Sequence, residues 1–284
     1  MDGCRIEVDV CRIGEEPSAS QDHFGEFTVG NGGVLEATVV VVGDKGTGSL
    51  IIEQGGMCEI AQSLFVGADP GSTGSTTVSG AGTMLAITED VGVGLRVGSG
   101  GQGSLSITAG GSVTSKTSRL GAASGSAGVV IVDGPNSTWT STQSTILGFS
   151  GDSQVTVSDG GTASSGGQLT LGNTAASTSQ AVVTGSGSHL TTSGLMIIGS
   201  SGAGAVNILD GGGVSTSTLS IGGNANSTGM LTIDGVGSTM HASGHVLCAT
   251  SGTGHLPIVQ LGTIVCCQAS FGATAAPSYA IHPS

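Results

Sequence analysis

Four glycine positions recur in a fixed order along this chain, and this repeat constrains the fold more than any other feature. The first glycine follows an aliphatic pair, the second opens a Gly-Gly, the third follows another aliphatic residue and the fourth opens a Gly-x-x-Ser/Thr. The set recurs with a long period of about 50 to 55 residues, which indicates a repeat architecture. In that order the glycines are Gly43, Gly98, Gly148 and Gly199; Gly55, Gly110, Gly160 and Gly211; Gly67, Gly121, Gly172 and Gly222; and Gly80, Gly134, Gly185 and Gly235.

Successive glycines of this set lie 11 to 14 residues apart, with one exception. Gly80 and Gly98 are 18 residues apart, which predicts a four-residue insertion around residues 87–94. Because glycine adopts positive φ without steric cost, glycines at this spacing predict a sharp corner at each of these positions.

Between the corners the chain alternates apolar and polar residues over four or five positions, as in SLSI at residues 104–107 and MLTI at residues 230–233. A period of two predicts short strands with one buried face. The residues predicted to point inward are Leu105, Ile107, Val130, Val132, Leu231 and Ile233, and those predicted to point outward are Ser106, Ile131 and Thr232.

Such strands are too short to be stable alone, and with 2% aromatic residues no single repeat can close a core. Stacking of successive coils solves both problems. We therefore predict an all-β fold, a parallel β-helix (solenoid) of about nine coils, with two coils of about 24 and 27 residues in each long repeat. Disorder is disfavoured because 37% of the residues are hydrophobic and are placed periodically.

The repeat predicts three segments: a non-repeat acidic N-terminal segment at 1–21, a β-helix repeat domain at 22–258 and a non-repeat C-terminal tail or cap at 259–284. The apolar stretch VLEATVVVV at 34–42 has no clear register and is interpreted as a cap strand or partial coil at the open end. Neither a signal-peptide pattern nor a membrane-spanning run of apolar residues is recognised. We expect the chain to be a fragment of a longer repeat protein.

Charge is distributed unevenly, since 14 of the 19 acidic residues precede Val91 and no Lys or Arg follows Arg119. The formal net charge of −13 without a basic face argues against nucleic acid or an anionic membrane as a partner. The six cysteines have neither the spacing of a zinc knuckle nor the distribution of a disulfide scaffold, so no metal site is predicted. They are Cys4, Cys11, Cys58, Cys248, Cys266 and Cys267.

Several motifs suggest chemistry but have simpler interpretations. The segment GSGGQG at 98–103 matches a nucleotide-binding pattern, yet a strand follows it instead of a helix, so a repeat corner is preferred. Asp-Gly pairs are interpreted as turns and not as calcium ligands. They begin at Asp133, Asp159, Asp210 and Asp234. The glycosylation patterns at Asn136 and Asn226 are expected by chance in a chain of this composition.

An enzyme remains the alternative, because parallel β-helices include polysaccharide lyases and hydrolases, which need clustered carboxylates on one face. The nearest acidic pair in the regular region is Asp152 and Asp159, and positions equivalent to Asp152 are not acidic in other copies, so the charges are not expected to form a site. His189 and His241 occupy nearly equivalent places and are interpreted as surface strand residues. Trp139 is interpreted as a packing residue and not as a sugar platform.

The units GSLSITAGGSVTS, VDGPNSTWTS and LTIDGVGSTM resemble the glycine- and serine-rich repeats in the passenger regions of bacterial autotransporter-type adhesins, over about residues 22–258. The resemblance implies a right-handed β-helix that is secreted to the extracellular side or the bacterial outer surface and serves as a stalk or adhesive surface, with host or cell-surface components or glycans as partners. We therefore expect a non-enzymatic structural or adhesive protein without cofactors, metal or catalytic residues. The alternative is a carbohydrate-active β-helix enzyme, and a weaker third is an ice- or crystal-binding solenoid.

Overall fold

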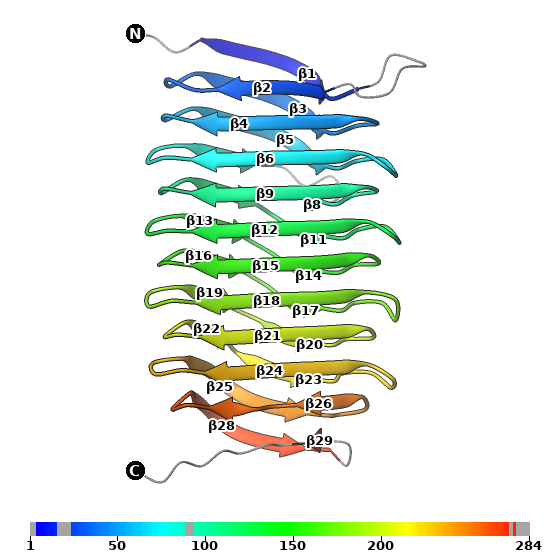
Figure 1. Cartoon of the computed structure of the whole chain (residues 1–284), viewed down its shortest axis with the longest axis vertical. Helices are drawn as coiled ribbons and strands as arrows, with labels where there is room; N and C mark the ends of the chain where they lie inside the picture. Colours follow the sequence, from blue (N-terminus) through cyan, green and yellow to red (C-terminus); the bar gives the residue numbers. More distant parts are fainter. Residues whose placement is uncertain (1–3, 16–23, 89–93, 273–274, 277–284) are drawn as a thin grey trace.

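The structure is a computed structural model that describes residues 4–15, 24–88, 94–272 and 275–276. Within these residues every regular element is a strand, and the strands stack as a solenoid of about 10 turns (Figure 1). All pairings between successive coils are parallel, as in the pairs of β12 with β9 and β15. The predicted all-β parallel β-helix is confirmed, with about one coil more than expected.

Each coil contributes one strand to a shorter sheet, and these strands face the viewer in Figure 1. Most of them have seven residues, and the column is in register from coil to coil. The strands of this sheet are β2 (Phe24–Val29), β4 (Thr47–Glu53), β6 (Thr73–Ser79), β9 (Gln102–Thr108), β12 (Ala127–Asp133), β15 (Asp152–Ser158), β18 (Thr178–Thr184), β21 (Ala203–Leu209), β24 (Thr228–Asp234), β26 (Thr253–His255), β27 (Ile258–Val259) and β29 (Ala275–Ala276).

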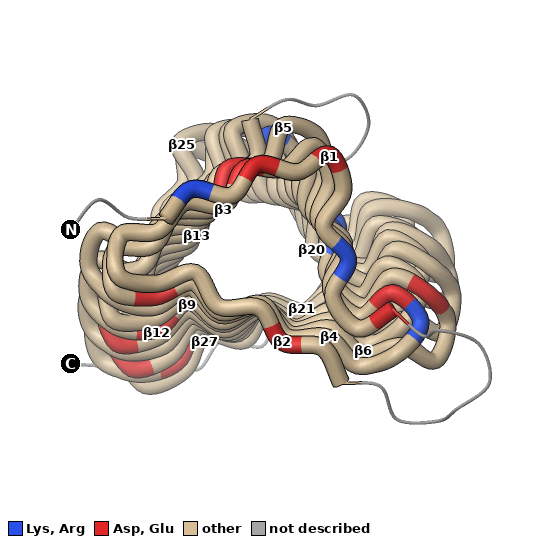
Figure 2. The backbone as a smooth tube through the Cα atoms, turned by 90° about the horizontal axis from the view of Figure 1, so that it is seen from above, with Lys and Arg blue, Asp and Glu red and all other residues tan. Residues whose placement is uncertain are grey.

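The rest of each coil belongs to a longer sheet, which bends at a corner and gives the solenoid a three-sided outline (Figure 2). In the middle coils the corner separates two short strands, whereas the first and last coils keep single long ones. The strands are β1 (Arg5–Ile13), β3 (Val34–Val42), β5 (Met57–Val66), β7 (Met84–Ile87), β8 (Leu95–Val97), β10 (Ser112–Ser115), β11 (Ser118–Leu120), β13 (Thr138–Ser141), β14 (Thr145–Leu147), β16 (Thr162–Ser165), β17 (Leu169–Leu171), β19 (His189–Thr192), β20 (Leu195–Ile198), β22 (Gly213–Thr216), β23 (Thr218–Ile221), β25 (Thr239–Cys248) and β28 (Thr263–Phe271).

The core is a column of small aliphatic side chains inside the three walls. The predicted alternation of strand residues is confirmed: every residue predicted to point inward is at most 1% exposed, while Ser106 and Thr232 are partly exposed and Ile131 is 39% exposed. Because equivalent inward residues stack directly on one another, each buried side chain contacts the coils above and below it. This contact between coils replaces the core that no single coil can form.

Two kinds of corner follow the strands of the shorter sheet, and from β4 onward they alternate along the axis. The tighter one has two successive residues in the left-handed region, as at Asp159 and Gly160 (φ 50° and 88°). The wider one has a left-handed glycine, one intervening residue and a second left-handed residue, as at Gly134 and Asn136. All the recurring glycines adopt positive φ. The wider corner is one source of the two predicted coil lengths.

A buried hydroxyl ties each wide corner to the tight corner of the preceding coil. The Ser137 hydroxyl is fully buried, accepts a hydrogen bond from the Gly110 N–H at 3.1 Å and donates to the Asp133 carbonyl at 2.7 Å. Buried backbone donors need such partners, because an unpaired one loses its hydration without compensation. The same link joins Gly55 to Thr83, Gly160 to Ser188 and Gly211 to Ser238. The Ser/Thr of the Gly-x-x-Ser/Thr pattern therefore connects coils.

Strands also lie beyond the predicted repeat boundaries. β1 belongs to the predicted 1–21 segment and pairs with β3, while β28 and β29 belong to the predicted 259–284 segment and pair with β25 and β26. The interpretation of residues 34–42 as an end cap is wrong, because β3 pairs with β1 on one side and β5 on the other. The division into three segments remains a prediction, and the expected insertion falls mostly on residues 89–93, outside the described residues.

The alternation of faces predicts unequal effects of two neighbouring substitutions in β9. Leu105→Ala is expected to lower the free energy of unfolding by about 2 to 4 kcal/mol, because it leaves a cavity between close-packed coils. Ser106→Ala, one position away on the outer face, is the matched control and is expected to have little effect. Unfolding in urea followed by circular dichroism measures both, and equal losses would contradict the assigned faces.

The hydroxyl link predicts that Ser137→Ala lowers stability by about 1 to 3 kcal/mol, because the Gly110 N–H loses its buried partner. Ser137→Thr is expected to retain most of the stability, since Thr83 fills the equivalent position in an earlier coil. Faster hydrogen exchange of the Gly110 amide in the alanine variant would identify the cause. An unchanged exchange rate would show that the hydroxyl is not the partner that protects it.

Candidate functional site

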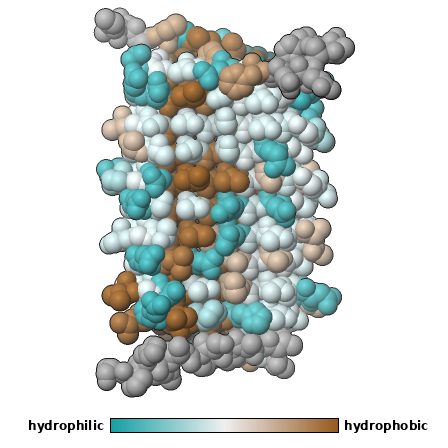
Figure 3. All heavy atoms as spheres, viewed as in Figure 1, coloured by the Kyte–Doolittle hydropathy of each residue, from teal (hydrophilic) through white to brown (hydrophobic). Residues whose placement is uncertain are grey.

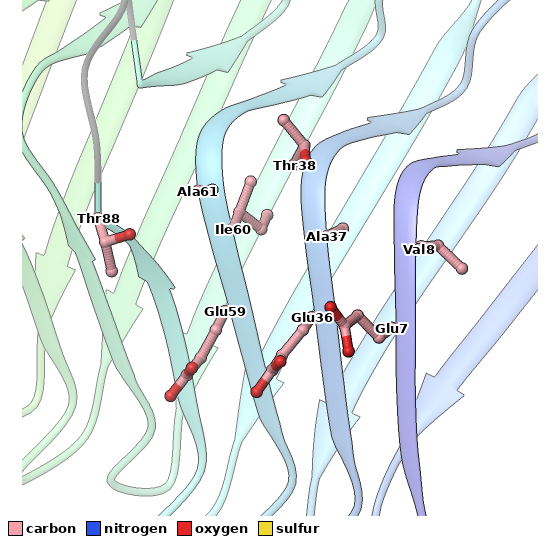
Figure 4. A pocket seen from close by; sticks show the side chains of 9 residues that line it. All are labelled: Glu7, Val8, Glu36, Ala37, Thr38, Glu59, Ile60, Ala61 and Thr88. Carbon is pink, nitrogen blue, oxygen red and sulfur yellow. The ribbon is translucent and has the colours of Figure 1, made fainter.

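The first coils place three glutamates side by side on the outer face of the longer sheet. Glu7 in β1 pairs with Glu36 in β3, which pairs with Glu59 in β5, so the three residues form one column across adjacent strands. Ala86 takes the same position in the next coil and ends the column. Figure 4 shows the glutamates in an open groove whose lining also includes Thr38 and Thr88.

The spacing of adjacent strands, about 4.8 Å, sets the spacing of the glutamate backbones. The Glu36 and Glu59 side chains extend in the same direction (Figure 4). Glu36 also forms an ion pair with Arg5 at 2.5 Å, and the Arg5 side chain is 64% exposed. A pair so accessible to water contributes little stability, and it partly neutralises the middle of the column.

Sequence reasoning missed this column, because it compared acidic residues only in the regular region, at Asp152 and its equivalent positions. The signal was present in the segments RIEV, VLEA and MCEI, where a glutamate stands one residue before an aliphatic or alanine residue that faces inward. The register of residues 34–42 was unassigned, so the three segments could not be aligned.

The acidic pair that the sequence analysis did weigh does not form a site. Asp152 begins β15 and Asp159 follows its last residue, so the two lie about 20 Å apart at the usual rise of a strand. Asp152 accepts a hydrogen bond from the Thr178 N–H of the next coil at 3.0 Å. Asp159 and Asp210 adopt φ of 50° and 51° in tight corners, which confirms the Asp-Gly turns at these two positions.

The two histidines are not equivalent in the structure. His189 is aligned with Gly213 in the next coil, whereas His241 pairs with Ser215, two residues further along β22. The His189 ring lies against Gly213, where an added Cβ would lie 2.4 Å from Nδ1, and its Nε2 is 3.0 Å from the Ser215 hydroxyl. Burial lowers the pKa of His189 below its usual 6.5.

Trp139 is a packing residue, as predicted. It is 3% exposed and is aligned with Val113 in one neighbouring coil and Ala163 in the other. The small Ala163 leaves room for the indole between the neighbouring coils. The Gly98–Gly103 segment likewise begins as a corner at Gly98 and runs into β9 at Gln102, which confirms its interpretation as a repeat turn.

All six cysteines are free thiols. Cys58 is fully buried, and burial, followed by the charges of Cys11 and Glu59, raises its pKa to about 12. Burial also raises the pKa values of Cys11 and Cys248. These three thiols are therefore poor nucleophiles at neutral pH, because the thiolate is the reactive form. Among the described residues, no group of three or more His, Cys, Asp or Glu could hold a metal ion.

No protein-family model matches the chain, and no curated protein matches it in sequence. A crystal structure of a TibC-catalyzed hyper-glycosylated TibA fragment is similar to it, with 16% sequence identity and a TM-score of 0.37 over 96% of this chain and 100% of that chain. At that identity and TM-score the likeness says nothing of function. The fold assignment rests on the strand pairing itself.

The lowered pKa of His189 predicts a loss of stability on mild acidification. Below pH 6.5 the unfolded chain takes up a proton at this position while the folded chain does not, so the unfolded state is favoured as pH falls from 6.5 toward the lower pKa of the folded state. We expect His189→Gln to lose less stability than the unsubstituted chain between pH 7 and about pH 5.5. Denaturant midpoints across this range measure the effect, and parallel curves for the two proteins would contradict it.

Proposed function

We propose that this chain is a non-enzymatic β-helical rod with a structural or adhesive role on the extracellular side or outer surface of a bacterium, with host or cell-surface components or glycans as partners. The proposal is carried by the positions of the residues that recur from coil to coil. The residues that repeat from coil to coil face inward or form corners, as Leu105, Gly110 and Ser137 illustrate. The repeat thus builds length and a continuous outer surface.

That surface is a stack of strands in register, which suits contact at many points along its length. Figure 3 shows the face of the shorter sheet, with polar side chains on its margins and apolar ones gathered along the middle. Along one outward column the side chain changes from coil to coil, from Val129 through Gln154 and Gln180 to Met230. The resemblance to autotransporter passenger repeats supports the same role. Among the described residues, no helix is long and apolar enough to cross a membrane.

A carbohydrate-active enzyme is the second candidate, and the glutamate column favours it, because glycoside hydrolysis uses two carboxylates about 5 Å or more apart. In the usual mechanism, however, the two groups act from opposite sides of the scissile bond. Glu36 and Glu59 extend the same way from adjacent strands (Figure 4), and Glu36 is paired with Arg5. The geometry therefore supports the rod better than the enzyme.

Two measurements on the purified chain test this proposal. Beads coated with the folded chain are expected to adhere to cells or to glycan-coated surfaces, and beads coated with the heat-unfolded chain are expected not to. No release of reducing ends or unsaturated sugars is expected from pectin, alginate or a neutral glycan. Turnover that disappears in Glu36→Gln or Glu59→Gln, but persists in the distant control Asp152→Asn, would contradict the proposal of a non-enzymatic rod and support the carbohydrate-active enzyme.

A further inference from the structure

Two arginines stack on neighbouring strands of the longer sheet, between two phenylalanines. Arg96 in β8 pairs with Phe65 in β5 on one side and with Arg119 in β11 on the other. Arg96 lies over the Phe65 ring at 5.3 Å from its centroid, and Arg119 lies over the Phe149 ring at 4.5 Å. Along the axis the order is therefore Phe65, Arg96, Arg119, Phe149, which we call the arginine pair with its flanking rings.

The two guanidinium groups carry like charges on adjacent strands, and nothing described neutralises them. The ion pairs of the described residues involve Arg5 and Arg12 instead. The strands from β8 to β20 on this side of the coil contain no Asp or Glu. Burial and the charge of Arg119 lower the pKa of Arg96, as expected for a strained like-charge pair.

The donors of this pair are also unused. A guanidinium offers five N–H donors, and no hydrogen bond joins the Arg96 or Arg119 side chain to another described residue. The Arg96 Nε is shielded from solvent without any partner. A shielded donor without a partner is unfavourable, so the site is incomplete until an acceptor binds.

We propose that Arg96 and Arg119 form a binding site for an acidic polysaccharide, with one carboxylate or sulfate group held between the two guanidinium groups. Each guanidinium can bind a carboxylate or sulfate through two parallel N–H donors, and one shared anion offsets part of the repulsion between the arginines. Phe65, Phe149 and the adjacent Ile146 are partly exposed and provide apolar contacts for a sugar ring.

The net charge of −13 does not prevent this binding. At physiological ionic strength charges are screened over about 8 Å, so the arginine pair dominates the potential at the site while more distant acidic residues contribute little. Binding should therefore weaken as salt rises, because its main attraction is between opposite charges at a partly exposed site. An acidic polysaccharide ligand specifies the partner in the adhesive function proposed above, and its biological role rests on that function.

The test measures binding of the purified chain to three immobilised polymers: polygalacturonate, which carries carboxylates, dextran sulfate, and neutral dextran. We expect binding to one or both acidic polymers and none to dextran. Arg96→Gln with Arg119→Gln should weaken that binding by about tenfold or more. Arg5→Gln with Lys45→Gln removes the same number of charges from exposed positions in the first coils and should leave binding nearly unchanged.

A third variant separates geometry from charge. Arg96→Lys with Arg119→Lys keeps both charges but loses the planar fork, so its binding should fall between the other two. Circular dichroism confirms that each variant is folded, and Arg119→Gln alone replaces the double variant if the latter unfolds. The proposal is overturned if no acidic polymer binds, or if the Arg5 and Lys45 control loses as much affinity as the arginine pair.

The outcome is distinct from that of the adhesion test. If acidic polymers bind through the arginine pair but coated beads do not adhere to cells, the site stands and the adhesive function fails. If beads adhere while the Arg96 and Arg119 variants bind every polymer like the unsubstituted chain, adhesion stands and the site is wrong.

Discussion

Pairing between coils is the interaction on which the rest of the structure depends. Among the described residues, no strand pairs with another strand of its own coil, so the backbone N–H and C=O groups of each strand find partners in the coils above and below. Buried backbone groups without partners would be costly, which makes each coil dependent on its neighbours. The outermost strand of the described residues shows the consequence, because the inward-facing Ile6 and Val8 of β1 remain 41% and 37% exposed where no further coil covers them.

The corners preserve this pairing over many coils. A side chain at Gly98 would place its Cβ 2.1 Å from the Ala127 carbonyl oxygen, and the residue also needs positive φ, so glycine meets two requirements at once. The buried hydroxyls of Ser137 and its equivalents satisfy the donors left by the alternate, tighter corners. Small residues and hydroxyls thus perform the packing that large aromatic residues perform in globular cores.

The outer surface is free to vary because stability resides inside. The glutamate column, His189 beside Gly213, and the arginine pair with its flanking rings all lie on outward positions of otherwise similar coils. Each arises where two or three neighbouring coils happen to carry matching residues in one column. Recognition in a solenoid of this kind is therefore built from short columns across coils, and we expect it to differ from one part of the rod to another.

The sequence by itself determined the coil length, the inward and outward faces and the corners, because each depends on residues close together in the chain. It also determined the parallel stacking, because this local pattern repeats at a regular spacing. It also contained the alignment of Phe65, Arg96 and Arg119, since each stands two residues before a recurring glycine. Tertiary structure alone decided that Glu7 joins the glutamate column, that His189 and His241 are offset, and that Phe149 covers Arg119. These contacts join residues more than twenty positions apart, and their register depends on corner lengths and side-chain directions that a local pattern does not specify.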